Sequence, residues 1–552
     1  MKKILSYLLL AVALLPLFSS CKSTKVPVTD PNLSNYEVPS SLRGEGGIFL
    51  SNKSKEEFRG VWIQTVFQDR YSRMNPQQAQ EYLQKLVQGL YETGFNAVLF
   101  QVRSEGDSFY DSPLEPWSRF VAGTQGKGPN PAWDPMEYMI KLCHERNMEF
   151  HAWINPYRMS ASKNMKQSSS HIAVQHPEWC FTYDGRKYLD PGLPESRAHI
   201  RQVVKDIVKR YDIDAVHMDD YFYPYPVGGQ KIPDQGTFDL YGPALGFDPK
   251  DKNAIGDFRR RNVNILIKSL NEDIKGLKPW VRFGISPFGI YANKKSWENG
   301  SETNGLQSYF DLYADVLLWA KEGWIDYLIP QIYWEIGHNA ADYATLCKWW
   351  ANHVDPRCHL YIGQSIERSL DGSATASPKP DLTKSNTHFV NKLSQVRSYG
   401  KKIRGNCFWY AYQVDENNFH VRDFLKHSVF CGQAALPAYT SLRDSDPDRV
   451  QKLDGDLVKT SKGIALLLKW EAPKCPDLDN GARPRYYNVY RFKKGEKVSI
   501  NGLSHLYTRV EGTQLYDYDI ATSGKYTYVV TAVDHYNNEG KQTKKSFKIN
   551  LN

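Results

Sequence analysis

The sequence predicts an α/β protein, a (β/α)8 TIM barrel followed by a small all-β sandwich, and two observations lead to that prediction. Between residues 59 and 428, short apolar runs typical of strands alternate with helical patterns eight times. After about residue 437, short strands follow one another with no helix between them. A chain of 552 residues has room for both parts, because a domain commonly takes about 100–200 residues.

The eight barrel strands are predicted from apolar runs that end in polar or turn-forming residues. They are Gly60–Val66, Phe95–Arg103, Met148–Tyr157, Asp214–Tyr221, Val281–Phe288, Asp326–Trp334, His359–Ile366 and Gly405–Tyr412. Eight strands that alternate with helices form parallel βαβ units, for which a closed barrel is the natural arrangement. The alternative, an open doubly wound sheet, needs a glycine-rich phosphate loop at its first strand, and Gly60–Ile63 offers none.

The intervening helices are predicted from apolar residues that recur with the period of a helix. They lie near residues 75–93, 134–147, 195–211, 254–277, 308–323, 339–354, 384–402 and 415–427. Asn75-Pro76 and Asp134-Pro135 are typical helix starts, and Gly94 is a typical helix end. We therefore expect the barrel to occupy residues 57–432.

The C-terminal part, residues 437–552, is predicted to be all-β behind a linker that runs from Pro437 to Pro447. Its expected strands are Ile464–Trp470, Tyr486–Phe492, His505–Val510 and Tyr526–Val533. The segments Trp470–Pro473, Tyr486–Arg491 and Gly524–Asp534 resemble a fibronectin type III domain. That resemblance implies a sandwich of about 100 residues with a spacing or binding role.

The N-terminus has the form of a secretory signal, with Lys2 and Lys3 before an apolar stretch that runs from Leu5 to Phe18. The segment Leu17–Cys21 resembles a bacterial lipobox, which implies cleavage after residue 20 and lipidation of Cys21. An ordinary signal peptide with a chance cysteine is the alternative. Residues 21–56 are polar and are expected to be a flexible tether. We therefore expect a lipid-anchored protein of the bacterial envelope, on the periplasmic side of the outer membrane.

Composition excludes several classes of protein. Hydrophobic residues make up 41% and charged residues 24%, as in ordinary globular proteins, and a mean hydropathy of -0.56 excludes a polytopic membrane protein. The net charge of +9 is scattered along the chain, so no nucleic-acid partner is expected. The cysteines other than Cys21 are odd in number and lack CxxC spacing, so neither a disulfide framework, a metal site nor a cofactor is predicted.

Polar and aromatic residues gather where the predicted strands end, which is where barrel enzymes carry their reactive groups. The third strand ends in Asn155–Arg158, the fourth in His217–Pro224 and the sixth in Pro330–Glu335. Several such ends are hard to explain by packing alone, because buried polar groups are costly without partners.

These strand ends carry a resemblance to the glycosyl hydrolase-like 10 family, which covers roughly residues 57–430. The segments with the resemblance are Phe58–Trp62, His151–Arg158, Asp219–Pro224, Ser286–Gly289 and Pro330–Trp334. It implies a barrel fold and glycosidase activity. One enterobacterial relative is a lipoprotein that hydrolyses peptidoglycan glycan strands stripped of their peptides, but the resemblance does not carry this substrate over to the present chain. The C-terminal sandwich is not a constant feature of the family.

Glycoside hydrolysis generally uses two carboxyl groups. Strand alternation puts His217 and Asp219 on one face, and we expect Asp219 at the barrel mouth as nucleophile or base. Asp220 is expected at the rim, or as the reactive group if the strand ends in a bulge. For the general acid, Glu335 and Glu105 remain open alternatives. Weaker candidates for that role are Glu302 and Asp190.

The remaining strand-end residues are predicted to bind the sugar, by hydrogen bonds or by stacking of aromatic rings. They are Trp62, Gln64, Gln101, His151, Asn155, Tyr157, Arg158, His217, Tyr221, Tyr223, Ser286, Gln331, Tyr333 and Trp334. Arg158 is expected either to pair with Asp219 and keep it ionised or to form a structural salt bridge. For each single aromatic residue, core packing is the alternative.

The leading hypothesis is a lipid-anchored glycosidase of a cell-envelope or extracellular polysaccharide such as peptidoglycan glycan. A non-catalytic glycan-binding lipoprotein is the second hypothesis, favoured if no Asp or Glu lies within about 10 Å of Asp219 across the cleft. A structural envelope scaffold is the third. Phosphate loops, a GxSxG elbow and HExxH are absent from the sequence, so NTPase, serine-hydrolase and zinc-protease functions lack their marks.

Overall fold

The structure is a computed structural model that describes residue 50 and residues 55–370, 380–475, 480–502, 505–520 and 523–550. The predicted signal peptide, the predicted lipidation site at Cys21 and nearly all of the predicted tether lie outside the described residues. Within the described ranges, no helix combines the length and the apolar character that crossing a membrane requires.

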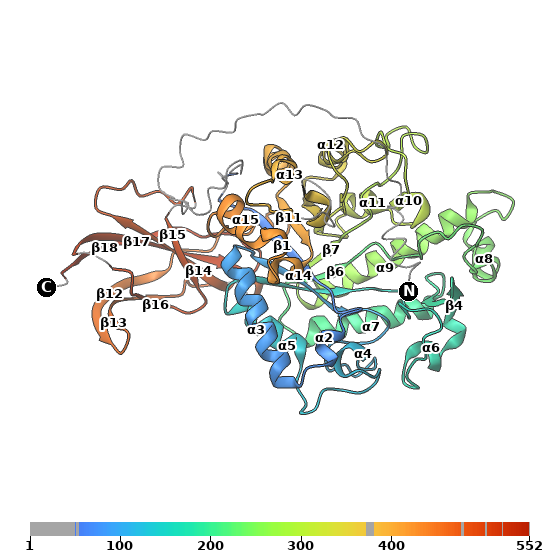
Figure 1. The fold of residues 1–552 in the computed structure, drawn as a ribbon, viewed down its shortest axis with the longest axis horizontal. Coiled ribbons are helices and arrows are strands. Elements are labelled where there is room, and N and C mark those ends of the chain that lie inside the picture. Colours follow the sequence, from blue (N-terminus) through green and yellow to red (C-terminus); the bar gives the residue numbers. More distant parts are fainter. Residues whose placement is uncertain are drawn as a thin grey trace. The chain divides into compact units, whose positions relative to one another are not determined.

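The first part of the described chain is a barrel of parallel strands (Figure 1). Its strands are β1 (Phe58–Ile63), β2 (Ala97–Arg103), β3 (Glu149–Ile154), β6 (Ala215–Met218), β7 (Arg282–Ile285), β8 (Tyr327–Leu328), β9 (His359–Leu360), β10 (Ile362–Ser365) and β11 (Gly405–Trp409). β8 pairs with β9 at one end of the sheet and β11 pairs with β10 at the other. β9 and β10 are consecutive pieces of one extended segment, so the sheet closes on itself. The barrel prediction is confirmed.

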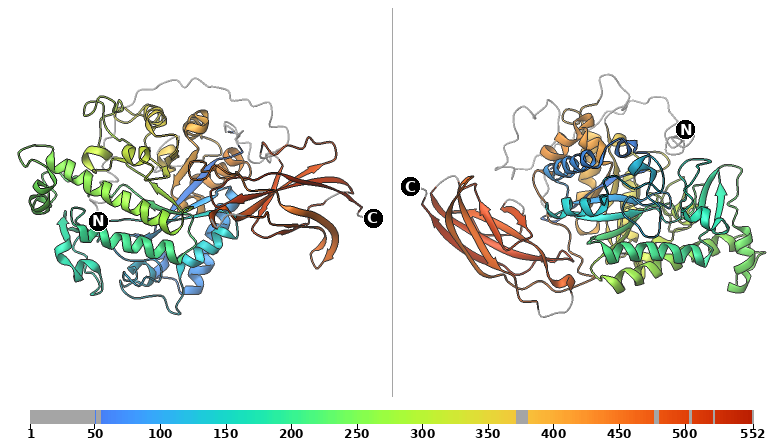
Figure 2. Two further views of the ribbon diagram at one scale, coloured as in Figure 1. Left: turned by 180° about the vertical axis from the view of Figure 1, so that it is seen from behind. Right: turned by 90° about the horizontal axis from the view of Figure 1, so that it is seen from below.

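Helices surround this sheet in the expected alternation (Figures 1 and 2). The longer ones are α3 (Pro76–Thr93), α5 (Pro135–His144), α7 (Pro194–Arg210), α9 (Ala254–Leu277), α12 (Tyr343–His353) and α13 (Thr387–Ser398). The side chain of Asn75 accepts the Gln78 N–H and so caps α3, and Gly94 ends it with φ 110°, a conformation that costs glycine little.

Two expected helices differ in detail from the prediction. The helix expected at 308–323 is two helices, α10 (Ser308–Asp311) and α11 (Val316–Lys321), because Asp315 caps a new start at the Leu318 N–H. The helix expected at 415–427 is replaced by α14 (Ala411–Asp415), α15 (Val421–Phe424) and a π-helical turn at Leu425–Phe430. Shorter helices lie in the loops: α2 (Asp69–Ser72), α4 (Arg119–Ala122), α6 (Ile172–Gln175) and α8 (Gln235–Tyr241).

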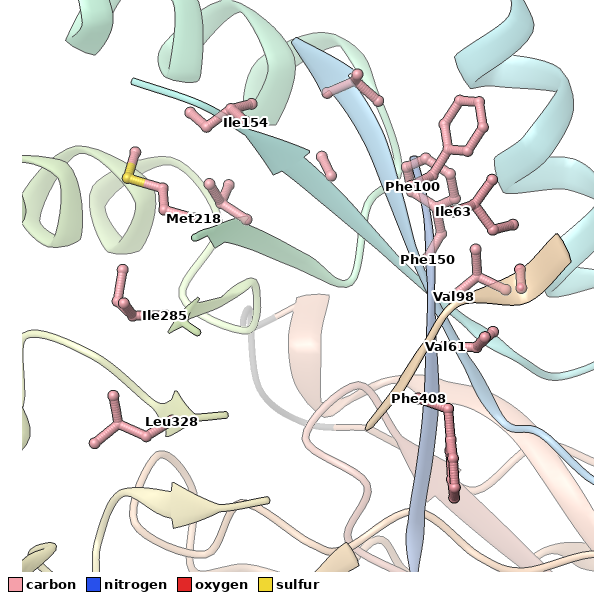
Figure 3. Packing of buried hydrophobic residues seen from close by; sticks show 14 of the residues in the cluster. Val61, Ile63, Val98, Phe100, Phe150, Ile154, Met218, Ile285, Leu328 and Phe408 are labelled. Atoms are coloured by element: carbon pink, nitrogen blue, oxygen red, sulfur yellow. The ribbon is translucent and has the colours of Figure 1, made fainter. Parts of the chain in front are cut away.

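The outward-facing side chains of the barrel strands form the main core beneath the helices. Figure 3 shows several of them, namely Val61, Ile63, Val98, Phe100, Phe150, Ile154, Met218, Ile285, Leu328 and Phe408. They are all but inaccessible to solvent, and burying each such side chain stabilises the fold by about 1.5–3 kcal/mol.

The inward-facing side chains alternate with these and fill the barrel with aromatic and polar groups. Phe58 and Trp62 of β1, Trp153 of β3 and Tyr327 of β8 belong to this inner cluster. Phe58 stacks on Tyr361 with ring centroids 4.0 Å apart. These described side chains therefore fill the barrel interior at this level.

The C-terminal part forms two antiparallel sheets, coloured orange to red in Figure 2. One sheet has the order β12 (Gln451–Thr460), β13 (Gly463–Glu471) and β16 (Gln514–Asp517); the other has the order β15 (Leu506–Val510), β14 (Pro484–Lys493), β17 (Gly524–Asp534) and β18 (Thr543–Ile549). Leu468, Val489 and Val530 from the two sheets share one core, so the all-β prediction is confirmed. The fibronectin type III resemblance stays a prediction.

This all-β part contacts the barrel at the end from which the parallel strands start. Arg485 lies 2.9 Å from Asp214, which precedes β6, and the Asn147 amide donates to the Arg509 carbonyl at 3.0 Å just before β3. The barrel mouth, at the opposite end of the strands, is therefore built without these contacts.

Candidate active site

Asp219 directly follows β6 and faces the barrel interior, as strand alternation predicts. Its Oδ2 accepts hydrogen bonds from the indole N–H of Trp153 at 3.1 Å and from the amide of Asn155. The carboxyl group is 4% exposed, and burial raises its pKa to about 6, although Arg158 and the two donors act in the opposite direction. Near neutral pH this carboxyl group can both hold and release a proton.

Asp220 is the second buried carboxyl group at the same strand end. The hydroxyl of Tyr225 donates to its Oδ2, and Gln331 also forms a hydrogen bond with it. Burial, and after it the charge of the neighbouring Asp219, raises the pKa of Asp220 to about 7. Adjacent buried carboxyl groups do not ionise independently, so the pair carries about one proton near neutral pH.

A chain of amide hydrogen bonds fixes the orientation of Asn155 toward Asp219. Asn155 Oδ1 accepts from the Gln101 amide at 2.7 Å and from Arg158 Nη2 at 3.0 Å, so its amide nitrogen is turned to the carboxylate. Gln101 Oε1 in turn accepts the backbone N–H groups of Thr65 and Val66, both at 2.9 Å. Arg158 thus acts on Asp219 through the electric field and through Asn155, while burial keeps the pKa of Asp219 raised.

Aromatic side chains line the mouth around the two carboxyl groups. Trp62 and Trp153 each lie edge-on to Trp409, with ring centroids 6.3 and 6.2 Å apart. Trp334 contacts Phe288 with centroids 5.5 Å apart. The half-buried predicted residues are Gln64, Arg158, Tyr221, Gln331, Tyr333 and Trp334. These partly accessible groups suit contact with a sugar.

Two site residues are missing from the sequence prediction. Trp409 ends β11 on its inner face and is half-buried, so the alternation that selected Asp219 would also have selected it. Tyr225, the partner of Asp220, lies beyond the strand end in a loop, where periodicity gives no signal.

Several predicted sugar-binding residues are buried below the mouth or beside it. His151 and His217 are fully buried inside the barrel, and Ser286 is only 1% exposed. Tyr157 and Tyr223 are buried: the Tyr223 ring packs on Tyr313 at 5.0 Å, and burial raises the pKa values of both tyrosines. Strand alternation gives the facing direction of a side chain but not its depth along the barrel axis.

The predicted general acids lie in very different surroundings. Glu105 is fully buried; Arg119 lies 3.2 Å from its Oε2, and the Ala161 N–H donates to its Oε1. Glu335 is exposed to solvent. The weaker candidates are also engaged in local contacts, Asp190 with the Thr237 hydroxyl at 2.5 Å and Glu302 with Lys294. Asp220 is the carboxyl group that the structure brings directly beside Asp219.

A separate surface cavity of about 190 Å³ lies between α2, α3 and the loop around residues 127–135. Tyr71, Phe109 and Trp133 contribute to its wall, and its lining residues, all of them described, include no carboxylate. It therefore offers none of the acid–base chemistry found at the mouth. Among the described residues, no group of three His, Cys, Asp or Glu side chains is arranged to hold a metal ion.

Comparison with known proteins agrees with this geometry. Residues 57–376, more than half of the chain and most of the barrel, match the family described as glycosyl hydrolase-like 10. The chain belongs to the glycosyl hydrolase-like 10 family. The match includes the barrel strands β1, β2, β3 and β6 to β10, and with them the Asp219–Asp220 pair, Asn155 and Gln331.

Curated relatives extend over most of this family member. Glycosyl hydrolase YngK of Bacillus subtilis is 37% identical over 510 residues, which is 91% of this chain and 95% of that protein. Glycosyl hydrolase DigH of Escherichia coli is 36% identical over 375 residues, 64% of this chain and 81% of that protein. Because the first alignment covers 91% of the chain, it includes much of the C-terminal all-β part as well.

Solved structures show more distant likenesses. The glycoside hydrolase domain of PgaB (BpsB) from Bordetella bronchiseptica aligns with a TM-score of 0.44 at 13% identity, covering 68% of this chain and 99% of that domain. The catalytic domain of a β-amylase from Paenibacillus polymyxa aligns with a TM-score of 0.43 at 9% identity, covering 68% of this chain and 99% of that domain. The family assignment does not depend on likenesses this distant.

Proposed function

We propose that the protein is a glycoside hydrolase that cleaves O-glycosidic bonds, with Asp219 and Asp220 as its reacting carboxyl groups. One observation carries the proposal: two adjacent, buried carboxyl groups stand at the C-terminal mouth of the barrel with pKa values raised to about 6 and about 7. Glycosidases need one carboxyl group that is protonated and one that is ionised at the working pH. Family membership supports the same reaction class.

The surroundings of the pair assign the two roles. Trp153 and Asn155 both donate hydrogen bonds to Asp219, and such donors favour the ionised form. Asp220 has the higher pKa, because its burial is reinforced by the charge of Asp219. Asp220 is therefore the general acid, and Asp219 is the carboxylate that acts as base or stabilises positive charge.

The adjacency of the pair favours a substrate-assisted reaction. Neighbouring residues start from Cα atoms about 3.8 Å apart, so both carboxyl groups reach the sugar from the same strand end. In substrate-assisted glycosidases, the carbonyl oxygen of a 2-acetamido group on the sugar replaces the enzyme nucleophile. Asp219 would then orient that acetamido group while Asp220 protonates the leaving oxygen. Expected substrates carry a 2-acetamido group next to the scissile bond.

Peptidoglycan glycan, which consists of 2-acetamido sugars, is the substrate that we propose. The half-buried Tyr221, Tyr333, Trp334 and Trp409 offer faces on which such sugars stack. The lipobox-like segment that ends at Cys21 supports attachment to the periplasmic side of the outer membrane. The C-terminal part is proposed to be a fibronectin type III-like module that contacts the barrel away from its mouth.

The decisive experiment compares two variants of the soluble protein that starts after Cys21. Intact and amidase-treated peptidoglycan are incubated with wild type, Asp219→Asn and Asp220→Asn, and the products are identified by mass spectrometry. Both variants should release no glycan fragments while still binding the polymer. Asp315→Asn is the matched control, because Asp315 is also a largely buried carboxyl group with a raised pKa but caps α11. Full turnover by Asp219→Asn would refute the assignment.

The same experiment tests the glycan-binding alternative. Asp220 supplies a second carboxyl group as the neighbouring residue and not from across the cleft, so the measured activity decides between the two functions. Wild-type protein that binds sacculi yet releases no product from any glycan tested would favour the non-catalytic role.

A further inference from the structure

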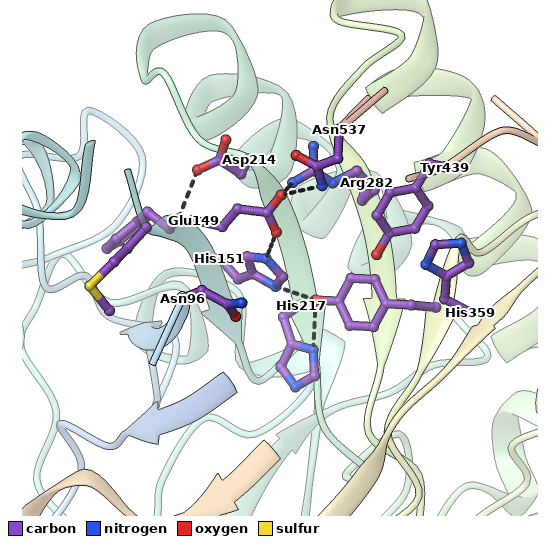
Figure 4. A network of polar contacts seen from close by, with 12 residues as sticks. Asn96, Glu149, His151, Asp214, His217, Arg282, His359, Tyr439 and Asn537 are labelled. Carbon is purple, nitrogen blue, oxygen red and sulfur yellow. Dashed lines mark hydrogen bonds and ion pairs between the residues drawn. The ribbon is translucent and has the colours of Figure 1, made fainter. Parts of the chain in front are cut away.

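A line of buried polar side chains runs through the barrel interior from its N-terminal end toward the mouth (Figure 4). His151 Nε2 lies 2.9 Å from Glu149 Oε2, and His151 Nδ1 lies 2.8 Å from the Tyr327 hydroxyl. The same hydroxyl lies 3.1 Å from His217 Nδ1, and His217 Nε2 lies 3.0 Å from the Ser286 hydroxyl. We call the following four residues the axial relay: Glu149, His151, Tyr327 and His217.

Glu149, the member of the axial relay nearest the N-terminal end of the barrel, can only accept hydrogen bonds. Glu149 lies against the guanidinium group of Arg282, and Arg485 is 3.6 Å away. Burial by itself would raise the pKa of Glu149, but Arg282 and His151 hold it at about 2. An ionised carboxylate has no proton to give, so His151 Nε2 must carry the hydrogen that it shares with Glu149.

The mouth end of the axial relay is bounded by a group that can only donate. The indole N–H of Trp62 points to His217 Nε2 at 3.3 Å. An indole has no acceptor, so His217 Nε2 must be bare and its proton must be on Nδ1. Burial also lowers the pKa of His217 well below its usual range, which agrees with a neutral ring.

Tyr327 joins these two ends without contradiction. When the His151 ring is neutral, its Nδ1 is bare and accepts the single hydrogen of the Tyr327 hydroxyl, while the hydroxyl oxygen accepts the Nδ1 hydrogen of His217. If Tyr327 donated to His217 instead, His217 would need its proton on Nε2, where it would face the indole N–H of Trp62. Every hydrogen bond of the axial relay therefore points from the mouth toward Glu149.

The strands provide space for this arrangement. A Cβ atom on Gly284 of β7 would lie 1.9 Å from Cζ of Tyr327, so the glycine is required where the tyrosine ring passes. A Cβ atom on Gly363 of β10 would lie 3.2 Å from Cη2 of Trp62. The rings of His217 and Tyr327 are nearly parallel, with 6° between their planes. The relay is thus part of how the barrel is packed.

The mouth end of the relay touches groups that hold both carboxyl groups of the proposed site. Trp62 lies against Trp409, which lies against Trp153, the donor to Asp219. On the other side, the carbonyl of Ser286 accepts the Gln331 amide at 2.9 Å, and Gln331 also bonds Asp220.

We propose that the axial relay is a one-directional hydrogen-bond chain that positions Trp62 and Ser286 beneath the Asp219–Asp220 pair. Its members are positioning residues, since each is at most 1% exposed and acts through other side chains. Asn537 of the C-terminal part donates to Glu149 Oε1 at 2.9 Å, so the all-β part holds the far end of the relay. The direction of the hydrogen bonds in the axial relay does not depend on the proposed function. The positioning role of the relay rests on that function.

The direction is tested by NMR of the histidine ring nitrogens in the soluble protein, with His217 assigned from a His217→Asn sample. In the wild type, His217 should be protonated on Nδ1 and bare on Nε2. Tyr327→Phe removes the central hydroxyl, so His217 should populate its second tautomer and the indole N–H resonance of Trp62 should move. Tyr361→Phe is the matched control: it removes another hydroxyl from the barrel interior, one that bonds Tyr439 at 2.8 Å and lies outside the relay.

Two results would overturn the proposal. One is a wild-type His217 protonated on Nε2, and the other is a Trp62 resonance that Tyr327→Phe leaves unmoved. If Tyr327→Phe does not fold, Ser286→Ala replaces it. That change removes one of the two donors to His217 Nε2, so the Trp62 resonance should still move while the proton stays on Nδ1; its transfer to Nε2 would equally overturn the proposal.

Activity adds a second, separate measurement. Tyr327→Phe should lower kcat about ten- to a hundredfold with little change in KM, because the carboxyl groups are misplaced while the sugar-stacking surface persists. Tyr361→Phe should keep the wild-type kcat. An unchanged kcat in a Tyr327→Phe protein would refute positioning. The NMR result needs no substrate, so failure of the hydrolase proposal leaves it interpretable.

Discussion

Replacing Asp220 with Asn should make the protein more stable at neutral pH while abolishing catalysis. In the native protein the pKa of Asp220 is raised from 3.8 to about 7. A shift of about three units corresponds to about 4 kcal/mol between the two protonation states. Asn removes the ionisable group but weakens the hydrogen bond from Tyr225, which offsets about 1 kcal/mol of that gain. We therefore expect Asp220→Asn to raise the free energy of unfolding by about 2–3 kcal/mol above about pH 7.

The sign follows from proton binding in the two states. Between pH 3.8 and about 7 the native Asp220 holds its proton while the unfolded one has lost it, so the free energy of unfolding of the wild type falls as pH rises. In the Asn variant, position 220 carries no ionisable group and so contributes no such fall in the free energy of unfolding. The difference between the proteins should therefore be small near pH 4, grow up to about pH 7 and stay constant above it.

Urea unfolding followed by tryptophan fluorescence at about pH 4.5 and about pH 8 measures this difference. The signal reports mainly on the barrel, because Trp470 is the one tryptophan after residue 437. The measurement at low pH serves as the internal control. If Asp220→Asn is no more stable relative to wild type at pH 8 than at pH 4.5, burial does not penalise the carboxylate, and its assignment as the general acid is refuted.

Four further predictions concern the site and its surroundings. The pH profile of kcat/KM should be bell-shaped with limbs near pH 6 and pH 7, and a profile without an alkaline limb would contradict the role of Asp220 as general acid. Trp153→Phe removes a hydrogen bond that favours the ionised Asp219, so the acidic limb should move to higher pH; a limb that stays in place would contradict this role. Glu105→Gln should lower the free energy of unfolding by about 1–3 kcal/mol while preserving kcat, and loss of kcat in a stable protein would restore Glu105 as an acid candidate. Cys21→Ala should shift the protein from the membrane to the soluble fraction and abolish palmitate labelling; retention in the membrane would argue against the anchor.

The fold was largely accessible to sequence reasoning, because the periods of strands and helices are local properties. All eight predicted barrel strands are present. Strand alternation also correctly predicted that Asp219 faces the interior, where it contacts Trp153. The predictions failed where local pattern is weak. β12, with its mostly exposed side chains, and β18, in which exposed residues alternate with less exposed ones, lack the apolar run that marks a strand.

The candidate site divides in the same way. Alternation and the family resemblance selected Asp219, Asn155 and Gln331, and the structure brings these side chains together. The identity of the acid could not be chosen from sequence, because it depends on which carboxyl group is buried beside another. Glu105 forms an ion pair with Arg119, and Glu335 is exposed to solvent.

The sequence by itself determined the barrel, the all-β tail, the family and the strand end that carries the carboxyl groups. Those features follow from periodicity and from short motifs, which a linear chain displays directly. The tertiary structure alone decided the burial of the Asp219–Asp220 pair, the depth of His151 and His217, and the link from Asn537 to Glu149. These depend on distances between residues far apart in the chain, and both burial and electrostatic coupling are set by such distances.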